Sequence, residues 1–198
     1  MKHTLYFITL LFVVCLCSCN KSKTGSFNKN EESVDTVWND YVQDTFFGVP
    51  FGTSKEALYE AFEKEGFYAD QATSTEDFVH FFPSKSNYYS FGGHNWEMLG
   101  VTFSNNKFVG IRFMNSSEDK ASAMSQYEHL NKSLTNKYKE TVVEKKDTTM
   151  YAQTIIFSKD TYARAACYRY ESISKQIFIG VELSYFSKKH YKSAEDEL

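Results

Sequence analysis

Residues 98–114 read MLGVTFSNNKFVGIRFM, and this stretch decides the fold class. On both sides of residues 105–107, apolar side chains alternate with small or polar ones, which is the period of a strand with one buried face. We expect a hairpin with a three-residue loop at 105–107. Its core face would hold three opposed pairs: Phe103/Val109, Val101/Ile111 and Leu99/Phe113.

Similar strand-like runs lie on both sides of this hairpin. With the hairpin itself, they occupy residues 78–82, 88–91, 98–104, 108–114, 151–158, 162–171 and 176–186. The runs are rich in β-branched and aromatic residues and are separated by turn-forming ones, as in an antiparallel meander.

Two helices are expected between the strands. Thr53 and Glu56 have the spacing of a capping box before an apolar stripe over 53–65, with Gly66 as the stop. The spacing of Ser116 and Asp119 favours a second helix over 119–138. The predicted fold class is α+β, with both helices on one face of an antiparallel sheet. The order of elements further favours two tandem αβββ units.

Composition excludes some partners. The chain has 198 residues, 42% hydrophobic and 17% aromatic, so it can bury a real core. The formal net charge is −3, with 22 basic and 25 acidic residues. This balance provides no basic surface for nucleic acid or for an anionic membrane, and we expect neither to be bound in that way.

The amino terminus indicates export. Residues 5–16 are apolar except for Thr9, and a helix of that length rises only about 18 Å, short of the roughly 30 Å hydrocarbon core. The run therefore predicts a signal peptide over 1–18. Its end, Leu16-Cys17-Ser18-Cys19, resembles the bacterial lipobox. The resemblance implies that Cys19 is acylated, because small Ser18 precedes it. Cys17, after bulky Leu16, is the weaker alternative.

The expected organisation follows from this signal. Residues 19–43 are polar and predict a lipidated tether, 44–188 the α+β domain, and 189–198 a polar tail. The alternative for the end of the tether is that it docks on the domain as a first strand or turn, through Val34, Val37, Trp38 and Tyr41. The last four residues are similar to the eukaryotic signal for endoplasmic-reticulum retention, but Glu195 replaces the usual basic residue. We expect a protein of the cell envelope, anchored in the membrane by the Cys19 lipid, in the outer membrane facing the periplasm.

The segment that opens the domain carries a family resemblance. Residues 47–54, FGVPFGTS, resemble a group of Bacteroidetes lipoproteins of unknown function. The layout over 46–186 is similar to the β-lactamase inhibitor protein fold, and more distantly to small lipoproteins of outer-membrane protein assembly. This chain lacks the disulfides of the inhibitor family, and none of its inhibitory residues can be matched. The resemblance therefore implies a fold and no functional residue.

Chemical motifs are sparse. His80, His94, His129 and His190 have no metal-ligand spacing, and no serine lies in a nucleophile elbow. We expect no enzyme activity, no cofactor and no metal, and a plain hairpin turn around His94. Asp35-Thr36-Val37 and Asp147-Thr148-Thr149 resemble the short sequon of periplasmic O-glycosylation, which implies Thr36 and Thr148 as acceptors.

The last hairpin predicts a binding surface. An even loop within 172–175 would place three pairs on the core face: Tyr170/Ile177, Tyr168/Ile179 and Ala166/Val181. The other face would pair Arg169 with Phe178, Cys167 with Gly180, Ala165 with Glu182 and Ala163 with Ser184. In the hairpin of residues 98–114, the face opposite the core would hold Thr102, Gly110, Gly100, Arg112, Met98 and Met114.

This second face would be a floor of small residues carrying a few large ones. Glycine in a strand often marks close approach by another backbone or a ligand. The expected anchors on that floor are Met98, Arg112, Arg169, Phe178 and Glu182. An ordinary solvated sheet face is the alternative. Two function classes stay open: a non-enzymatic binding or inhibitory module with a protein partner in the envelope, and a structural or assembly lipoprotein of the outer membrane.

Overall fold

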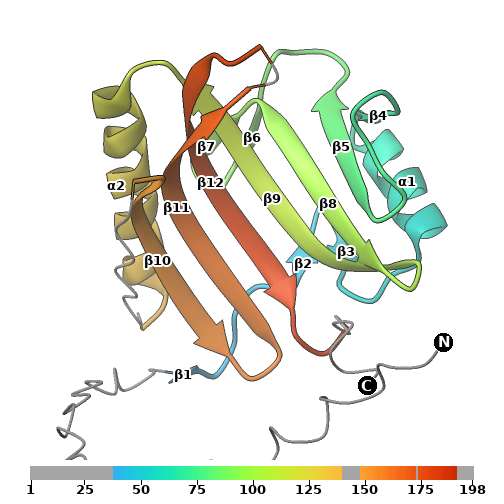
Figure 1. Ribbon diagram of the computed structural model, residues 1–198. Helices are drawn as coiled ribbons and strands as arrows, with labels where there is room; N and C mark the ends of the chain where they lie inside the picture. The colour runs from blue at the N-terminus through green and yellow to red at the C-terminus, as the bar shows by residue number, and fades with distance from the viewer. Residues whose placement is uncertain (1–37, 140–147, 173, 191–198) are drawn as a thin grey trace, which may run out of the picture. The chain divides into compact units, whose positions relative to one another are not determined.

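The computed structural model describes residues 38–139, 148–172 and 174–190. Their centre is an eight-stranded sheet in the order β1-β10-β11-β12-β9-β8-β5-β4 (Figure 1). The strands are β1 Trp38–Asn39, β4 Phe67–Asp70, β5 Phe78–Pro83, β8 Met98–Ser104, β9 Lys107–Ser117, β10 Met150–Ser158, β11 Thr161–Glu171 and β12 Ile177–Ser187. Neighbours are antiparallel except β1, which pairs with β10 in parallel. The α+β class is confirmed, and the sheet is mixed, not wholly antiparallel.

Two small hairpins lie outside the main sheet. They consist of β2 Thr45–Phe46 with β3 Val49–Pro50, and β6 Tyr89–Phe91 with β7 His94–Trp96. All seven predicted strands are present. The strands that the sequence pattern missed have two to four residues, too few for a periodic signal to emerge.

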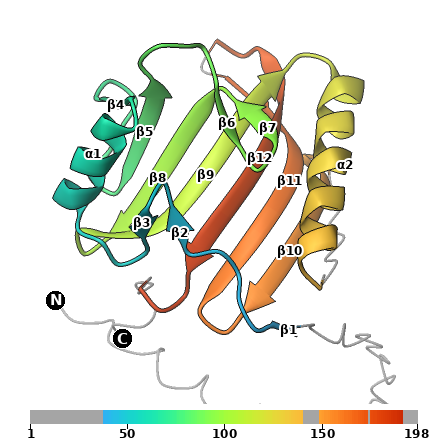
Figure 2. The same cartoon turned by 180° about the vertical axis from the view of Figure 1, so that it is seen from behind.

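Both predicted helices form, α1 over Lys55–Lys64 and α2 over Lys120–Lys137. Figure 2 shows them in front of the same face of the sheet, near its opposite edges. The predicted capping of α1 is wrong by one residue. Ser54 is the N-cap and accepts from the Ala57 amide, whereas the Thr53 hydroxyl donates to the Pro50 carbonyl.

The second capping box is also wrong, although the helix itself is present. Asp119 is the N-cap of α2, and its carboxylate accepts from the amides of Ala121 and Ser122. Ser116 belongs to β9, and its hydroxyl lies 2.7 Å from the Tyr170 hydroxyl. A carboxylate at this position also interacts favourably with the positive end of the helix dipole.

The core lies between the sheet and the helices, and the two small hairpins fill the space between α1 and α2 (Figure 2). Phe91 of β6 stacks on Phe113 of β9, with ring centroids 4.0 Å apart. Phe46 of β2 lies 4.9 Å from the Tyr185 ring of β12. Helices and hairpins together therefore cover one face of the sheet.

The described fold begins inside the segment predicted as tether. Trp38–Asn39 forms the edge strand β1, and the side chain of Val42 is buried in the core. The predicted signal peptide, residues 19–37 and the end of the chain from 191 lie outside the described residues. Within the described part, neither helix has the length and apolar character needed to cross a membrane.

Candidate binding face

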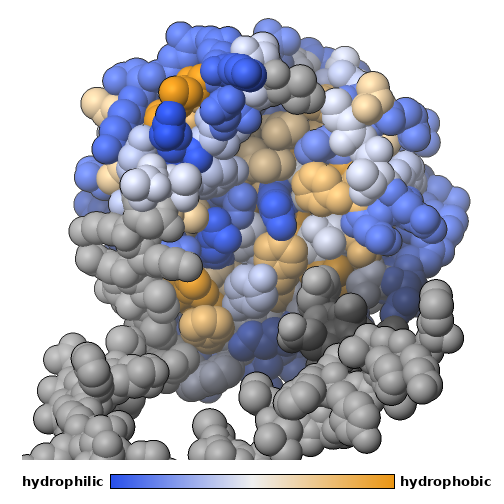
Figure 3. Space-filling view, in the orientation of Figure 1, coloured by the Kyte–Doolittle hydropathy of each residue, from blue (hydrophilic) through white to orange (hydrophobic). Residues whose placement is uncertain are grey.

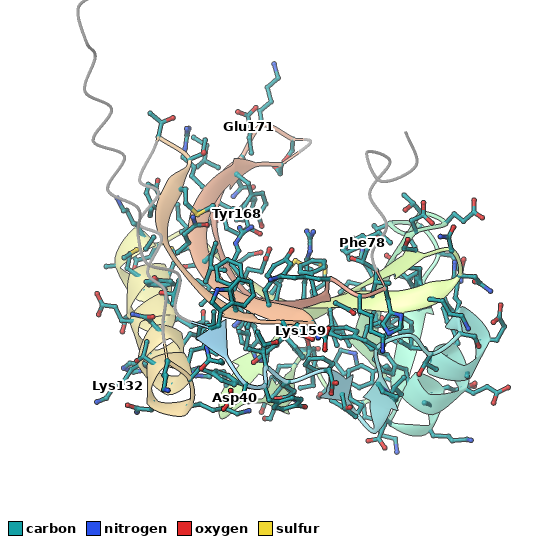
Figure 4. The ribbon with its side chains drawn as sticks, turned by 90° about the horizontal axis from the view of Figure 1, so that it is seen from below. Asp40, Phe78, Lys132, Lys159, Tyr168 and Glu171 are labelled. Atoms are coloured by element: carbon teal, nitrogen blue, oxygen red, sulfur yellow. The ribbon has the colours of Figure 1, made fainter. Side chains whose placement is uncertain are left out.

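No other described element covers the face of the sheet opposite the helices (Figure 1). Figure 4 shows it as concave, with Tyr168 of β11 and Phe78 of β5 on its two sides and Lys132 of α2 on the far side of the sheet. We call it the open face. In Figure 3, hydrophobic and strongly hydrophilic patches alternate across its middle. The face is therefore chemically mixed and not uniformly polar.

The β11–β12 hairpin differs from the prediction by one residue. Glu171 pairs with Ile177, which leaves five residues, 172–176, in the loop in place of an even number. Tyr168 consequently lies opposite Gly180. A shift of one residue turns every side chain of a strand to the other face. The predicted facing is right for β12 and wrong for β11.

Three small residues of β11 therefore lie on the helix side of the sheet. Ala163, Ala165 and Cys167 are fully buried, and α2 packs against β11 and β12. The small side chains do mark a close approach, as expected, but the element that comes close is α2. Burial also raises the pKa of the Cys167 thiol, so its reactive thiolate form is disfavoured.

The five predicted anchor residues therefore do not all lie on the same face of the sheet. Arg169 is exposed and lies opposite Ile179, whose side chain is buried on the helix side. Its expected place on the open face is wrong. Phe178 and Glu182 of β12 lie on the open face together with Met98 and Arg112. Both Glu182 and Met98 pair with Met114, and paired residues point to the same face of a sheet. Sequence reasoning thus placed four of the five anchors on one surface.

The β8–β9 hairpin follows its predicted register over most of its length. Two of the predicted core pairs, Leu99/Phe113 and Val101/Ile111, are confirmed. The third is wrong, because a bulge after Thr102 places Phe103 opposite Phe108. The turn has two residues, Asn105 and Asn106, and both have positive φ, as in a type I′ turn. The pairs on the open face keep the expected register.

Aromatic rings of the chain itself cover the glycines of the open face. Phe78 lies over Gly100, Phe186 over Gly110 and Tyr168 over Gly180. A Cβ at Gly100 would be 2.5 Å from Cζ of Phe78, and one at Gly110 would be 2.4 Å from Cδ1 of Phe186. Glycine is needed so that each ring can lie against the sheet. Aromatic rings of the chain itself therefore cover the expected floor of small residues, and a partner would contact these rings.

A hollow of about 300 Å³ opens in this face. It is lined by Thr102, Arg112, Tyr162, Arg164, Glu182, Phe186, Ser187 and Lys188. Arg112 of β9 and Arg164 of β11 lie on either side of Ser184 of β12, each paired with it. Three neighbouring strands thus bring two arginines to one hollow. The volume is at the lower end of the range for ligand pockets, which suits a side chain or a small molecule.

Several polar atoms in the hollow are not used by the fold. Nε of Arg112, Nε of Arg164 and Oγ1 of Thr102 are buried and have no hydrogen-bond partner among the described residues. The guanidinium carbon of Arg112 lies 5.5 Å from the Phe78 ring centroid and 5.3 Å from that of Phe186. These cation–π contacts hold the planar group against the two rings. A buried donor without a partner costs about 1–3 kcal/mol.

The charges around the hollow are mostly positive. Arg112, Arg164 and Lys188 line it against a single carboxylate, Glu182, which is 4% exposed and accepts from the Ser184 hydroxyl at 2.8 Å. Burial lowers the pKa of Lys188. The nearby Tyr168 hydroxyl has its pKa raised to about 12, first by burial and then by the negative charge of Glu182. The hollow therefore favours an anion.

Arg164, Tyr162 and Phe186 were not among the predicted residues. Arg164 and Tyr162 were missed because the register error placed their alternate positions on the wrong face. A compositional signal was available: only three of the 22 basic residues are arginine, and two of those three line the hollow. Arginine is preferred to lysine where two hydrogen bonds to a planar anion are required.

Other candidate sites gain no support. The described residues contain no group of three His, Cys, Asp or Glu placed to hold a metal ion. The turn expected near His94 is confirmed, with Gly92 and Gly93 at positive φ between β6 and β7. Thr148 is exposed, whereas Thr36 and Cys19 lie outside the described residues.

Fold and site together define an α+β protein with one covered and one open sheet face, the open one carrying a hollow with two arginines. Comparisons of the chain with protein-family models, with curated proteins and with solved structures find no match.

Proposed function

We propose that this chain is a lipid-anchored protein of the cell envelope that acts as a non-enzymatic binding or inhibitory module. Cys19 carries the lipid, in the outer membrane facing the periplasm. The open face binds a protein partner that presents negative charge. The observation that carries this proposal is the uncovered concave face, with aromatic rings and two arginines whose Nε atoms have no hydrogen-bond partner in the described chain.

The chemistry of the open face supports a binding role. An antiparallel sheet with one solvated face normally shows polar side chains there. Here the half-buried rings of Phe78, Tyr162, Phe186, Tyr168 and Phe178 lie on that side. Tyr162 stacks on Phe186 at 5.2 Å, and Tyr170 on Phe178 at 5.8 Å. Aromatic and arginine side chains are those that most often dominate protein interfaces.

The order of elements supports, as part of the proposal, an origin from two tandem units. α1 precedes β4, β5, β8 and β9, whereas α2 precedes β10, β11 and β12, and β9 and β12 pair at the centre of the sheet. The first unit has a fourth sheet strand and the inserted β6–β7 hairpin. The units would therefore be αβββ in core layout, with additions in the first.

The lipid anchor is tested by Cys19→Ala. The acyl chains would supply the hydrophobic attachment, so the variant should move from the membrane fraction to the soluble envelope fraction or remain unprocessed. Membrane fractionation and electrophoretic mobility measure both results. The matched control is Cys17→Ala, which should leave the protein in the membrane. Unchanged fractionation of Cys19→Ala would contradict the anchor.

The binding face is tested by photo-crosslinking in intact cells. A photo-reactive phenylalanine analogue in place of Phe178 should give one discrete crosslinked product, because this half-buried ring stands on the open face. The control places the same analogue at Lys132, exposed on α2 on the far side of the sheet (Figure 4). A product from Lys132 alone, or none from either position, would contradict the proposal. A crosslink to outer-membrane assembly machinery would favour the assembly role over inhibition.

A further inference from the structure

We propose that the hollow between Arg112 and Arg164 binds the carboxylate of an acidic side chain from the protein partner. This inference rests on the proposed function and specifies its central contact. The observation is that two arginines, from β9 and β11, line one hollow together with Thr102.

The unused polar atoms define what the hollow can take. Nε of Arg112 and Nε of Arg164 are donors only, so their partner must supply acceptor oxygens. A carboxylate has two such oxygens in one plane, which matches the fork of a guanidinium group. The Thr102 hydroxyl can donate a further bond. Neither Nε has a hydrogen-bond partner within the described chain, although Arg112, Arg164 and Glu182 line the same hollow.

The charge balance selects the kind of anion. Two arginines with Glu182 leave one net positive charge among the groups of the interior, whereas the Lys188 ammonium is engaged at the rim and donates to the Ser158 carbonyl. The Lys188 ammonium lies 4.5 Å from the Trp38 ring centroid and 4.8 Å from that of Phe157, which holds it over these rings. A single negative charge is therefore better matched to the interior than the two charges of a phosphate.

The surroundings of the hollow favour a side chain of a protein over a free acid. Phe78, Tyr168, Phe178 and Met98 extend the open face beyond the lining of the hollow. A small acid would leave these apolar groups uncovered. A protein segment with an acidic residue between apolar ones would fill the hollow and cover its rim.

The test uses the full chain in detergent micelles with ¹⁵N-labelled arginine, whose three residues give three Nε–H signals. The probe is a blocked tripeptide with glutamate between two phenylalanines. Its addition should shift the signals of Arg112 and Arg164 in a saturable way and leave the signal of Arg169, on the other face, in place. The same peptide with glutamine should bind at least about tenfold more weakly, because charge-assisted hydrogen bonds are lost.

Variants provide the second arm. Arg112→Gln and Arg164→Gln should each weaken binding of the glutamate peptide by about tenfold or more, and Arg169→Gln should leave it unchanged. Thermal unfolding checks that each variant folds. If a variant does not fold, the shifts of the arginine Nε–H signals in the native chain decide the question. Equal binding of the glutamine peptide overturns the carboxylate assignment. Tighter binding of inorganic phosphate than of the glutamate peptide also overturns the carboxylate assignment. If acetate binds as tightly as the peptide, the assignment of the carboxylate to a protein side chain is overturned.

Failure of this inference can be told apart from failure of the proposed function. If Arg112→Gln with Arg164→Gln keeps the crosslink from position 178 at full yield, the open face binds a partner without using the hollow. That result overturns the inference alone. If the native chain gives no crosslink from position 178, the proposed function itself is overturned.

Discussion

At the level of single residues, the open face depends on glycines that make room for rings. Gly110 is buried, and Phe186 lies directly against it while stacking on Tyr162 and facing the guanidinium of Arg112. A glycine in a strand normally weakens it, because it adds backbone entropy and no packing. Here the Phe186 ring, from a neighbouring strand, occupies the space of the missing side chain. The same ring also forms one wall of the hollow.

Gly110→Ala should destabilise the fold by about 1–3 kcal/mol, because the new methyl group overlaps the Phe186 ring and must displace it. Urea denaturation measures the loss. The control is the same change in a Phe186→Ala background, where space for the methyl exists and the loss should largely disappear. An equal loss in both backgrounds would contradict the ring contact.

At the level of elements, β11 shows how one strand can fit two registers. Its alternate residues form an aromatic set with Tyr168 and Tyr170 and a small set with Ala163, Ala165 and Cys167. Hydrophobic content alone favours burying the tyrosines. The helix α2 decides the other way, because its buried face, with Tyr127 and Leu130, packs over the small residues. The tyrosines are then displaced to the open face.

This packing predicts a sharp effect of side-chain size. Ala165→Leu should cost about 1–3 kcal/mol, since the site is fully buried in the core beneath α2 and has no room for three more carbons. Ala121→Leu, an equal change at an exposed position of α2, should stay within about 0.5 kcal/mol of the native chain. Chemical denaturation compares the two. Equal stability of both variants would show that α2 does not rest on β11.

At the level of the whole molecule, burial of tyrosines links stability to pH. Burial raises the pKa of Tyr168 to about 12 from 10.0, and it raises the pKa of Tyr89 and Tyr185 further. The folded chain therefore keeps protons that the unfolded chain releases above pH 10. Stability contributed by these groups is fully present below pH 10 and is lost as pH rises.

The free energy of unfolding should fall between pH 10 and 12, by at most about 1.4 kcal/mol per pH unit for each such tyrosine. Denaturant midpoints at several pH values measure the slope. Tyr168→Phe should reduce this slope, because the group that holds one of the protons is gone. An unchanged slope in that variant would mean that Tyr168 ionises as freely in the folded chain as in the unfolded one.

The predicted site was partly right for a reason that can be traced to the pattern of each strand. Met98, Arg112, Phe178 and Glu182 come from β8, β9 and β12, where each strand has one clearly apolar set of alternate residues. Such strands can be assigned to a face without knowledge of their neighbours. Arg169 and the missed Arg164 both come from β11, which has no such one-sided pattern.

The sequence by itself determined the α+β class, the seven predicted strands and both helices, because periodicity and turn residues act within about ten residues of one another. Only the tertiary structure decided three other features. Helix α2 selected the buried face of β11, rings from neighbouring strands covered the glycines, and β1 paired with β10 in parallel where an antiparallel sheet was expected. Each of these depends on volume that a distant segment fills, and local preference contains no information about that volume.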